Sequence, residues 1–311
     1  MILCVTPNPA LDRTLVVPQF QVGAVLRPSD VIVVAGGKGL NVARAVRVLG
    51  GDARCAGLIG GHSGHLFAGL ARREGLEGIW TWVAGETRIC TIIVDPDSAD
   101  TTGIYEPSFV VQLDGWERFH ADVIHATNGA DAVCLCGSLP RGVSPDAFAA
   151  LVMAIRATGA LVWVDTSGAA LAAALRTSTS GIKINGDEAA ELLGHPVADI
   201  AMAHAAAAAI RGHGVDTAVV TLGRLGAVLL DRQGCWWAKP PEIQAVNTVG
   251  SGDACLAGLL QAYTSNISPP EALRQAVAAG AANAQSVDAG TFSRKTWKTL
   301  LEATTVKSLS D

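Results

Sequence analysis

The stretch "AVCLCGSLPRGVSPDAFAALVMAIRATGALVWVDTSG", residues 132–168, contains two apolar strand-like runs with a helical pattern between them. The runs, 132–136 and 161–164, are continuously apolar and lack the alternation of a half-exposed strand. The segment near 145–157 has helical character. Buried strands separated by a helix are typical of a parallel sheet that is covered by helices on both faces. This stretch therefore predicts an α/β fold.

The same alternation continues toward the C-terminus. Further strands are predicted at 182–184 and 217–221, and helices near 169–176, 187–194 and 202–212. In such sheets ligands collect beyond the carboxyl ends of the strands. The polar or glycine-rich segments that follow the strands should therefore line one edge of the sheet together: "GSLPRG", "DTSG", "NGDE" and "TLGRLG".

The first third of the chain has a different pattern. The segments "RTLVVPQF", "SDVIVV" and "RICTIIVD" resemble strands without intervening helices. We predict that they form a small antiparallel sheet outside the main one, a lid with strands from about 12–34 and 88–112. No linker, charge block or repeat divides the sequence, so residues 1–311 are expected to form one domain. The polar segment 304–311 is expected to be frayed.

Composition excludes several classes of partner. Half of the 311 residues are hydrophobic and the net charge is -5, so neither nucleic acid nor an anionic membrane is an expected partner. No apolar run reaches the roughly 18 residues that a membrane span needs. The start, "MILCVTPNPALDR", is expected to be a first strand and not a signal peptide. The seven cysteines include no CxxC pair and are expected to be buried free thiols in a cytoplasmic protein.

The segment "NTVGSGDACLAG", residues 247–258, joins a turn to an apolar helix. Small residues at 250–252 let successive backbone N–H groups point at one spot, and the helix adds its unpaired amides and positive dipole end. Together these groups make an anion site. Asp253 would repel a phosphate there unless it faces a hydroxyl that attacks the phosphate and gives up its proton. From this stretch alone, Asp253 is either a general base or a helix cap.

A second glycine-rich segment, "AGGKGLN" at 35–41, also precedes a helical stretch. It is not a Walker A phosphate loop, which needs Ser or Thr after the lysine, because Gly39 follows Lys38. Its lysine can pair with an anion, and Asn41 offers both a donor and an acceptor to a sugar hydroxyl. Upstream, Asp12 follows a proline-punctuated turn and can accept two hydroxyls. The alternatives are a tight turn with a solvated lysine, and an Asx turn at Asp12.

Seven elements occur in register along the chain: "TPNPALD", "GGKGLNVAR", "GETR", "GSLPRGVSPDAF", "KINGDEAAEL", "TLGRLGA" and "NTVGSGDACLAGL". In this order they resemble the ribokinase-like carbohydrate kinases of the phosphofructokinase-B type, and within them the 1-phosphofructokinase and tagatose-6-phosphate kinase group. The resemblance covers almost the whole chain. It implies a ribokinase-like three-layer sandwich with a central, mostly parallel sheet and a small β-sheet lid. It also implies a homodimer formed through the lid.

The resemblance further implies that ATP, with Mg²⁺, phosphorylates a hydroxyl of a sugar phosphate. Asp253 would be the base, and the amides of Gly250, Ser251 and Gly252 the anion hole. On the nucleotide side the implied residues are Asn185, Thr221, Gly223, Gly226 and Asn283, with Glu188 organising Mg²⁺ through water. On the acceptor side they are Asp12, Gly37, Lys38, Asn41, Arg88 and Ser138, and more weakly Arg27.

The sequence departs from the family pattern at a few positions. Ile184 replaces the proline of the usual K-P-N-x-x-E element, which alters the turn but keeps Asn185 and Glu188. His62 and His65 match no family element. Because no Cys or carboxylate nearby completes a metal site, we expect them in a solvated loop.

The leading functional hypothesis is phosphorylation of a ketohexose phosphate, because an acceptor that already carries a phosphate accounts for Lys38 and Arg88 beside the residues expected to bind the sugar. The first choice of acceptor is fructose 1-phosphate, which gives fructose 1,6-bisphosphate. Tagatose-6-phosphate kinase and 6-phosphofructokinase are the alternatives. A catalytically inactive nucleotide- or sugar-binding regulator is a further hypothesis, which the complete anion loop and Asp253 argue against. A dehydrogenase would need G-x-G-x-x-G after the first strand, where "TPNPALD" stands instead.

Overall fold

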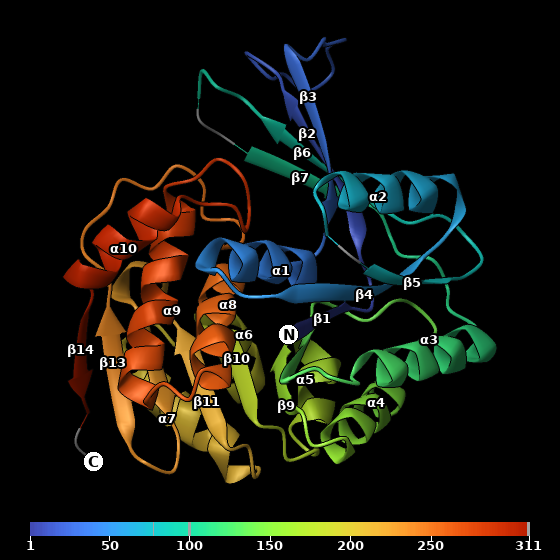
Figure 1. Ribbon diagram of the computed structural model, residues 1–311. Coiled ribbons are helices and arrows are strands. Elements are labelled where there is room, and N and C mark those ends of the chain that lie inside the picture. Colours follow the sequence, from blue (N-terminus) through green and yellow to red (C-terminus); the bar gives the residue numbers. More distant parts are fainter. Residues whose placement is uncertain (77, 99–100, 310–311) are drawn as a thin grey trace.

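A ten-stranded sheet forms the centre of the computed structural model, which describes residues 1–76, 78–98 and 101–309 (Figure 1). Seven strands in a row, from β11 to β5, run parallel, and β12, β13 and β14 add an antiparallel edge. The prediction of a mostly parallel sheet is confirmed. The order is β14 (Thr305–Ser308), β13 (Cys235–Lys239), β12 (Ala227–Leu230), β11 (Thr217–Thr221), β10 (Gly181–Asn185), β9 (Leu161–Asp165), β8 (Ala132–Cys136), β1 (Ile2–Thr6), β4 (Ala53–Ile59) and β5 (Gly78–Trp82).

Helices cover both faces of this sheet, each over its own hydrophobic core. Side chains along β1 alternate between the two cores: Ile2 and Cys4 enter one, Leu3 and Val5 the other. This double burial explains the continuous apolar runs in the sequence. One face carries α1 (Lys38–Leu49), α2 (Gly61–Arg73), α8 (Ser251–Thr264), α9 (Pro269–Ala284) and α10 (Arg294–Ala303). The other carries α3 (Leu113–Ala126), α4 (Pro145–Ala157), α5 (Gly168–Ala174), α6 (Gly186–Leu193) and α7 (Ile200–Gly212).

A separate four-stranded sheet, the lid, projects from this body (Figure 1). Its order is β3 (Asp30–Gly36), β2 (Ala10–Val16), β6 (Ile89–Val94) and β7 (Thr101–Tyr105). The expectation that the lid is antiparallel throughout is wrong, because β2 and β6 pair in parallel. Both strands leave the main sheet at the same edge, β2 after β1 and β6 after β5, and so both run outward. Their partners β3 and β7 run back.

Two further local expectations are wrong. The C-terminal segment is not frayed over Thr305–Ser308, because β14 pairs with β13 and extends the sheet; residues 310–311 lie outside the described part. His62 and His65 lie in α2 and not in a loop. The Glu86 carboxylate accepts hydrogen bonds from the backbone N–H groups of His62 and Ser63, at 3.1 and 2.8 Å, and thus supplies a cap that is absent from the local sequence.

All seven cysteines are buried thiols that form no disulfide, as expected. Among the described residues, no helix combines the length and the apolar composition needed to cross a membrane.

Candidate active site

The N-terminus of α8 brings the predicted anion loop to the edge of the main sheet. Gly250 precedes the helix in a left-handed conformation, and Ser251, Gly252 and Asp253 form its first turn. A Cβ at position 252 would lie only 2.8 Å from Lys183 Nζ, so glycine lets the helix start pass close over this cation without displacing it. The loop amides and the positive end of the helix dipole therefore lie above a buried positive charge, which favours an anion.

Asp253 is 5% exposed, and its Oδ2 accepts a hydrogen bond of 2.9 Å from Asn41 Nδ2. This contact joins the two glycine-rich segments, which are far apart in the sequence. Burial, followed by the nearby Asp165 carboxylate, raises the pKa of Asp253 to about 6. The N-cap of α8 is Gly250 and has no side-chain cap hydrogen bond, so Asp253 is not a helix cap, and its role as a base stays a prediction.

An ion-pair network lies beneath this loop. Lys183 Nζ is 2.6 Å from Asp165 Oδ2, and the two side chains are 3% and 0% exposed. Lys38 Nζ bonds to Asp165 Oδ1 at 2.9 Å and to Glu188 Oε1 at 3.0 Å. Although burial opposes its charge, the Asp165 carboxylate holds the pKa of Lys183 above its ordinary value. The network fixes charges of both signs next to the start of α8.

Sequence reasoning assigned no role to Asp165 or Lys183. A signal was present, because "IKI" places a lysine within a buried strand, where a charge requires a partner. The sequence did not show that the partner is the aspartate that ends β9.

Asn185 and Glu188 form a capping box at the start of α6. Asn185 Oδ1 accepts from the Glu188 backbone N–H at 2.8 Å, and Glu188 Oε2 accepts from the Asn185 N–H at 2.9 Å. Thr221, at the end of the adjacent β11, donates to the Ile184 carbonyl at 3.4 Å. These predicted nucleotide residues therefore lie together at one strand edge, beside Lys38.

Two other residues predicted on the nucleotide side have clear structural contacts. Asn283 is fully buried; its amide donates to the Val249 carbonyl at 2.8 Å and to Ser251 Oγ at 3.2 Å, and its carbonyl accepts from the Gly290 N–H. It thus supports the anion loop, and its placement beside adenine stays a prediction. Gly226 lies where a Cβ would overlap the carbonyl of Ala238. Gly223 begins a short 3-10 turn, Gly223–Leu225, and has open space around it.

On the acceptor side, Asp12 lies in β2 and faces the same region as Asp253. Burial raises the pKa of Asp12 to about 6, against the opposing charges of Arg44 and Arg88. Asp12 is part of a strand and not an Asx turn. Gly37 precedes α1, so Lys38 and Asn41 occupy the first turn of that helix. The structure therefore brings Asp12, Asn41 and Asp253 together.

Arg88 and Ser138 are connected through Asn8, which sequence reasoning missed. Arg88 Nη2 donates to the Asn8 carbonyl at 3.1 Å, and Asn8 Nδ2 donates to Ser138 Oγ at 3.1 Å. Among the described residues, the buried atoms Thr6 Oγ1, Asn8 Oδ1 and Arg88 Nε have no hydrogen-bond partner. Arg27 does not join them, because it lies in the exposed connection between β2 and β3, at the far end of the lid.

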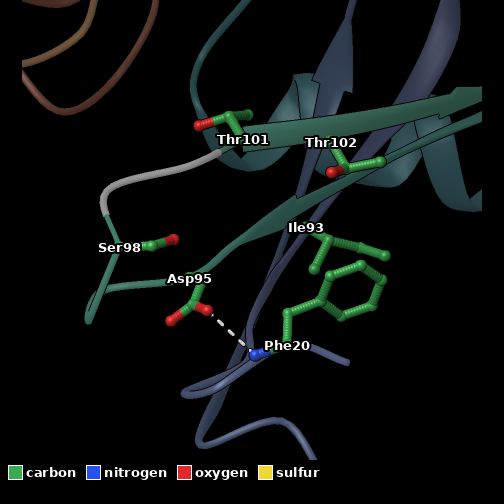
Figure 2. A pocket seen from close by; sticks show the side chains of 6 residues that line it. All are labelled: Phe20, Ile93, Asp95, Ser98, Thr101 and Thr102. Carbon is green, nitrogen blue, oxygen red and sulfur yellow. Dashed lines mark hydrogen bonds between the residues drawn. The ribbon is translucent and has the colours of Figure 1, made fainter. Parts of the chain in front are cut away.

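A hollow of about 420 Å³ in the lid is lined by Phe20, Ile93, Asp95, Ser98, Thr101 and Thr102. Figure 2 shows these six side chains. Asp95 accepts hydrogen bonds from the backbone N–H groups of Gln19 and Phe20, at 3.1 and 2.9 Å. It thereby secures the chain connection at the outer end of the lid. None of the predicted site residues lines this hollow.

Asp253 is thus a buried carboxylate at a glycine-rich helix N-terminus, in contact with Asn41 from the second glycine-rich segment. Residues 7–296 match the model of the pfkB family carbohydrate kinases. The chain is 31% identical over 281 residues to a 1-phosphofructokinase of Haemophilus influenzae, with 90% of each chain covered. It is 36% identical over 267 residues to one of Xanthomonas campestris, which covers 84% of this chain and 83% of the other.

A solved structure of phosphofructokinase-2 from Escherichia coli, described as a complex with fructose-6-phosphate, has the same fold. Its TM-score is 0.89 and its identity 27%, with 97% of this chain and 98% of the other covered. The chain belongs to the pfkB family of carbohydrate kinases. It is an ATP-dependent sugar kinase.

Proposed function

We propose that this kinase phosphorylates a hydroxyl of a ketohexose phosphate, with fructose 1-phosphate as the acceptor and fructose 1,6-bisphosphate as the product. The observation that carries the proposal is the position of Asp253. It lies at the anion loop and is held by Asn41 from the acceptor side. A base in that position lies next to both the hydroxyl of the acceptor and the phosphate of the donor.

Asp253 accepts the proton of the attacking hydroxyl. Its Oδ2 is engaged by Asn41, so Oδ1 is the oxygen offered to the acceptor. With a pKa of about 6 the carboxylate is ionised at neutral pH. As the hydroxyl oxygen bonds to the γ-phosphorus, the bond from that phosphorus to the β–γ bridging oxygen breaks and ADP leaves. Because the transition state is loose, positioning matters more than strong basicity.

The amides of Gly250, Ser251 and Gly252 would bind the phosphate charge. The positive charge of Lys183, which is paired with Asp165, adds to their attraction for the phosphate. Lys38 lies beside these amides and forms ion pairs with Asp165 and Glu188. Thr221, Gly223 and Gly226 would line the nucleotide along the next strand and its turn. Asn283 would act by holding the loop in shape.

Glu188 fits a magnesium ion bound through water. Both of its oxygens are already engaged, by the Asn185 N–H and by Lys38. The described residues hold no cluster of three or more His, Cys, Asp or Glu side chains able to chelate a metal. Mg²⁺ commonly keeps several waters and takes few protein ligands besides substrate phosphates, so this arrangement suits it. When bound, the ion would neutralise phosphate charge.

Arg88 and Ser138 would bind the phosphate that the acceptor already carries, and Asp12, Gly37 and Asn41 its sugar hydroxyls. Two carboxylates already neutralise Lys38, which leaves Arg88 as the better cation for that phosphate. The unpaired Arg88 Nε is a donor with which a phosphate oxygen can pair.

A panel of acceptors with ATP and Mg²⁺ tests the assignment. We expect kcat/KM for fructose 1-phosphate to exceed that for unphosphorylated fructose by roughly 100-fold or more, since the Arg88 contact is charge-assisted. Preferred turnover of tagatose 6-phosphate or fructose 6-phosphate would move the assignment to one of the alternatives. Equal turnover of fructose would contradict a phosphate subsite.

The lid offers a surface for a second copy of the chain. On one face of its sheet, the side chains of Val31 and Ile104 are exposed, large and apolar. We propose a homodimer that covers them. Mass measurement in solution tests this, with Ile104→Asp expected to shift the protein toward the monomer.

A further inference from the structure

Arg44, on α1, has no role in the proposed transfer, yet it is in contact with the residue that holds Asp253. Its Nη1 donates to Asn41 Oδ1 at 2.9 Å, and its Nη2 donates to the Ala35 carbonyl at 2.6 Å. Its Nε lies 2.6 Å from Glu74 Oε2, and the Arg44 side chain is 10% exposed. The guanidinium is therefore fixed from three sides by groups on β3, α1 and the end of α2.

This contact determines which way the Asn41 amide points. A guanidinium can only donate and a carboxylate can only accept. Asn41 lies between the two, so its oxygen must face Arg44 and its nitrogen must face Asp253. The observed distances, 2.9 Å on each side, show this arrangement.

We propose that Arg44 is a positioning residue of the kinase: it orients the Asn41 amide so that Nδ2 donates to Asp253 Oδ2, which leaves Oδ1 of the base free for the acceptor hydroxyl. The inference rests on the proposed role of Asp253 as the base.

Without Arg44, only the Asp253 carboxylate orients the Asn41 amide, because the amide oxygen has lost its donor. The amide then turns more freely, and the hydrogen bond to the ionised form of Asp253 is formed for a smaller fraction of the time. The other charged groups around Asp253 remain: Asp165 on β9, Lys183 on β10, Lys38 on α1 and Asp12 on β2. Loss of Arg44 also removes a positive charge that favours ionised Asp12. Both effects move the onset of activity to higher pH.

The test compares Arg44→Met and Arg44→Lys with the wild type, using fructose 1-phosphate and ATP from pH 5.5 to 9. A hydrogen bond to an ionised group is worth roughly 10- to 100-fold, and kcat of Arg44→Met should fall by that factor. The KM for ATP should change little, and the acid limb of the pH profile should move upward. Arg44→Lys keeps the charge and should recover part of kcat.

Arg47→Met is the matched control. Arg47 lies one turn further along α1 and donates to the Glu74 carbonyl at 3.0 Å, without touching Asn41. Its kcat and pH profile should equal those of the wild type. If Arg44→Met does not fold, the test uses Arg44→Lys instead. Its effect on kcat is then measured once in the wild-type protein and once in the Asn41→Ala variant. A residue that acts through Asn41 has no further effect on kcat once Asn41 is gone.

Folded Arg44 variants with wild-type kcat and an unmoved acid limb would overturn the proposal, as would full additivity with Asn41→Ala. A wild-type chain inactive toward every acceptor in the panel is a different result. It would overturn the proposed function itself, and the role of Arg44 with it.

Discussion

Lys183 and Asp165 form an ion pair of 2.6 Å beneath the N-terminus of α8, and both side chains are almost completely buried. Asp165 also binds Lys38, whereas Asp165 is the only carboxylate that hydrogen-bonds Lys183 among the described residues. Asp165 therefore has a second cationic partner, whereas Lys183 has no second carboxylate partner among the described residues. Substitution of Asp165 and substitution of Lys183 should thus lower the stability of the protein by different amounts.

Asp165→Asn should destabilise the protein by about 3–5 kcal/mol, because it leaves the buried Lys183 ammonium without its carboxylate. Lys183→Met should cost clearly less, since Asp165 keeps Lys38. Urea unfolding monitored by circular dichroism measures both. The exposed pair Arg176–Asp146 is the control, and Asp146→Asn there should change the unfolding free energy little. Equal costs for the two buried substitutions would contradict this account.

Asp253→Asn should lower kcat by roughly 10²- to 10⁴-fold, because the amide keeps the shape and the bond from Asn41 but cannot take a proton. ATP binding, measured by calorimetry, should persist. Turnover close to that of the wild type would show that Asp253 is not the base.

The same variant should be more stable than the wild type at neutral pH. The pKa of Asp253 rises on folding from 3.8 to about 6, so the folded state binds more protons and stability falls as pH increases through this interval. The difference between these two pKa values corresponds to about 3 kcal/mol of unfolding free energy above pH 6. This difference in stability between the variant and the wild type vanishes below the pKa of the unfolded state. Thermal or urea unfolding of the two proteins at pH 4 and pH 8 checks this, and a constant difference at both pH values would contradict it.

Activity of the wild type should fall on the acid side as Asp253 becomes protonated, with kcat/KM declining below about pH 6. Asp12 also has a pKa of about 6 and contributes to the same limb. The Asp12→Asn variant separates the two, because its remaining limb reports Asp253. A wild-type profile that stays flat down to pH 4.5 would be incompatible with a base of this pKa.

Arg88→Met should raise the KM for fructose 1-phosphate by roughly 10- to 100-fold, since it removes a charge-assisted contact to the acceptor's phosphate. The KM for ATP should stay the same. Arg27→Met is the control, because Arg27 is exposed at the far end of the lid. An equal effect from both substitutions would place the acceptor phosphate elsewhere.

Several features followed from the sequence alone because the signals are local. Continuous apolar strands such as Ala132–Cys136 and the intervening helices predicted the parallel sheet and its two covering layers. The small residues before Asp253 predicted the turn that leads into α8. The lid strands were predicted, but not the parallel pairing of β2 with β6, which depends on where both strands leave the main sheet.

The tertiary structure decided which charged and polar groups meet. Asn41 and Asp253 are 212 residues apart, and Lys38 and Asp165 are 127 apart, so no local spacing shows that they bond. The cap that Glu86 provides for α2 and the contact of Arg44 with Asn41 arise in the same way. Local periodicity determines strands, helices and turns, because it reflects the backbone and its burial. The partner of a buried charge depends on distance and desolvation in the folded molecule, and these exist only once the chain has packed.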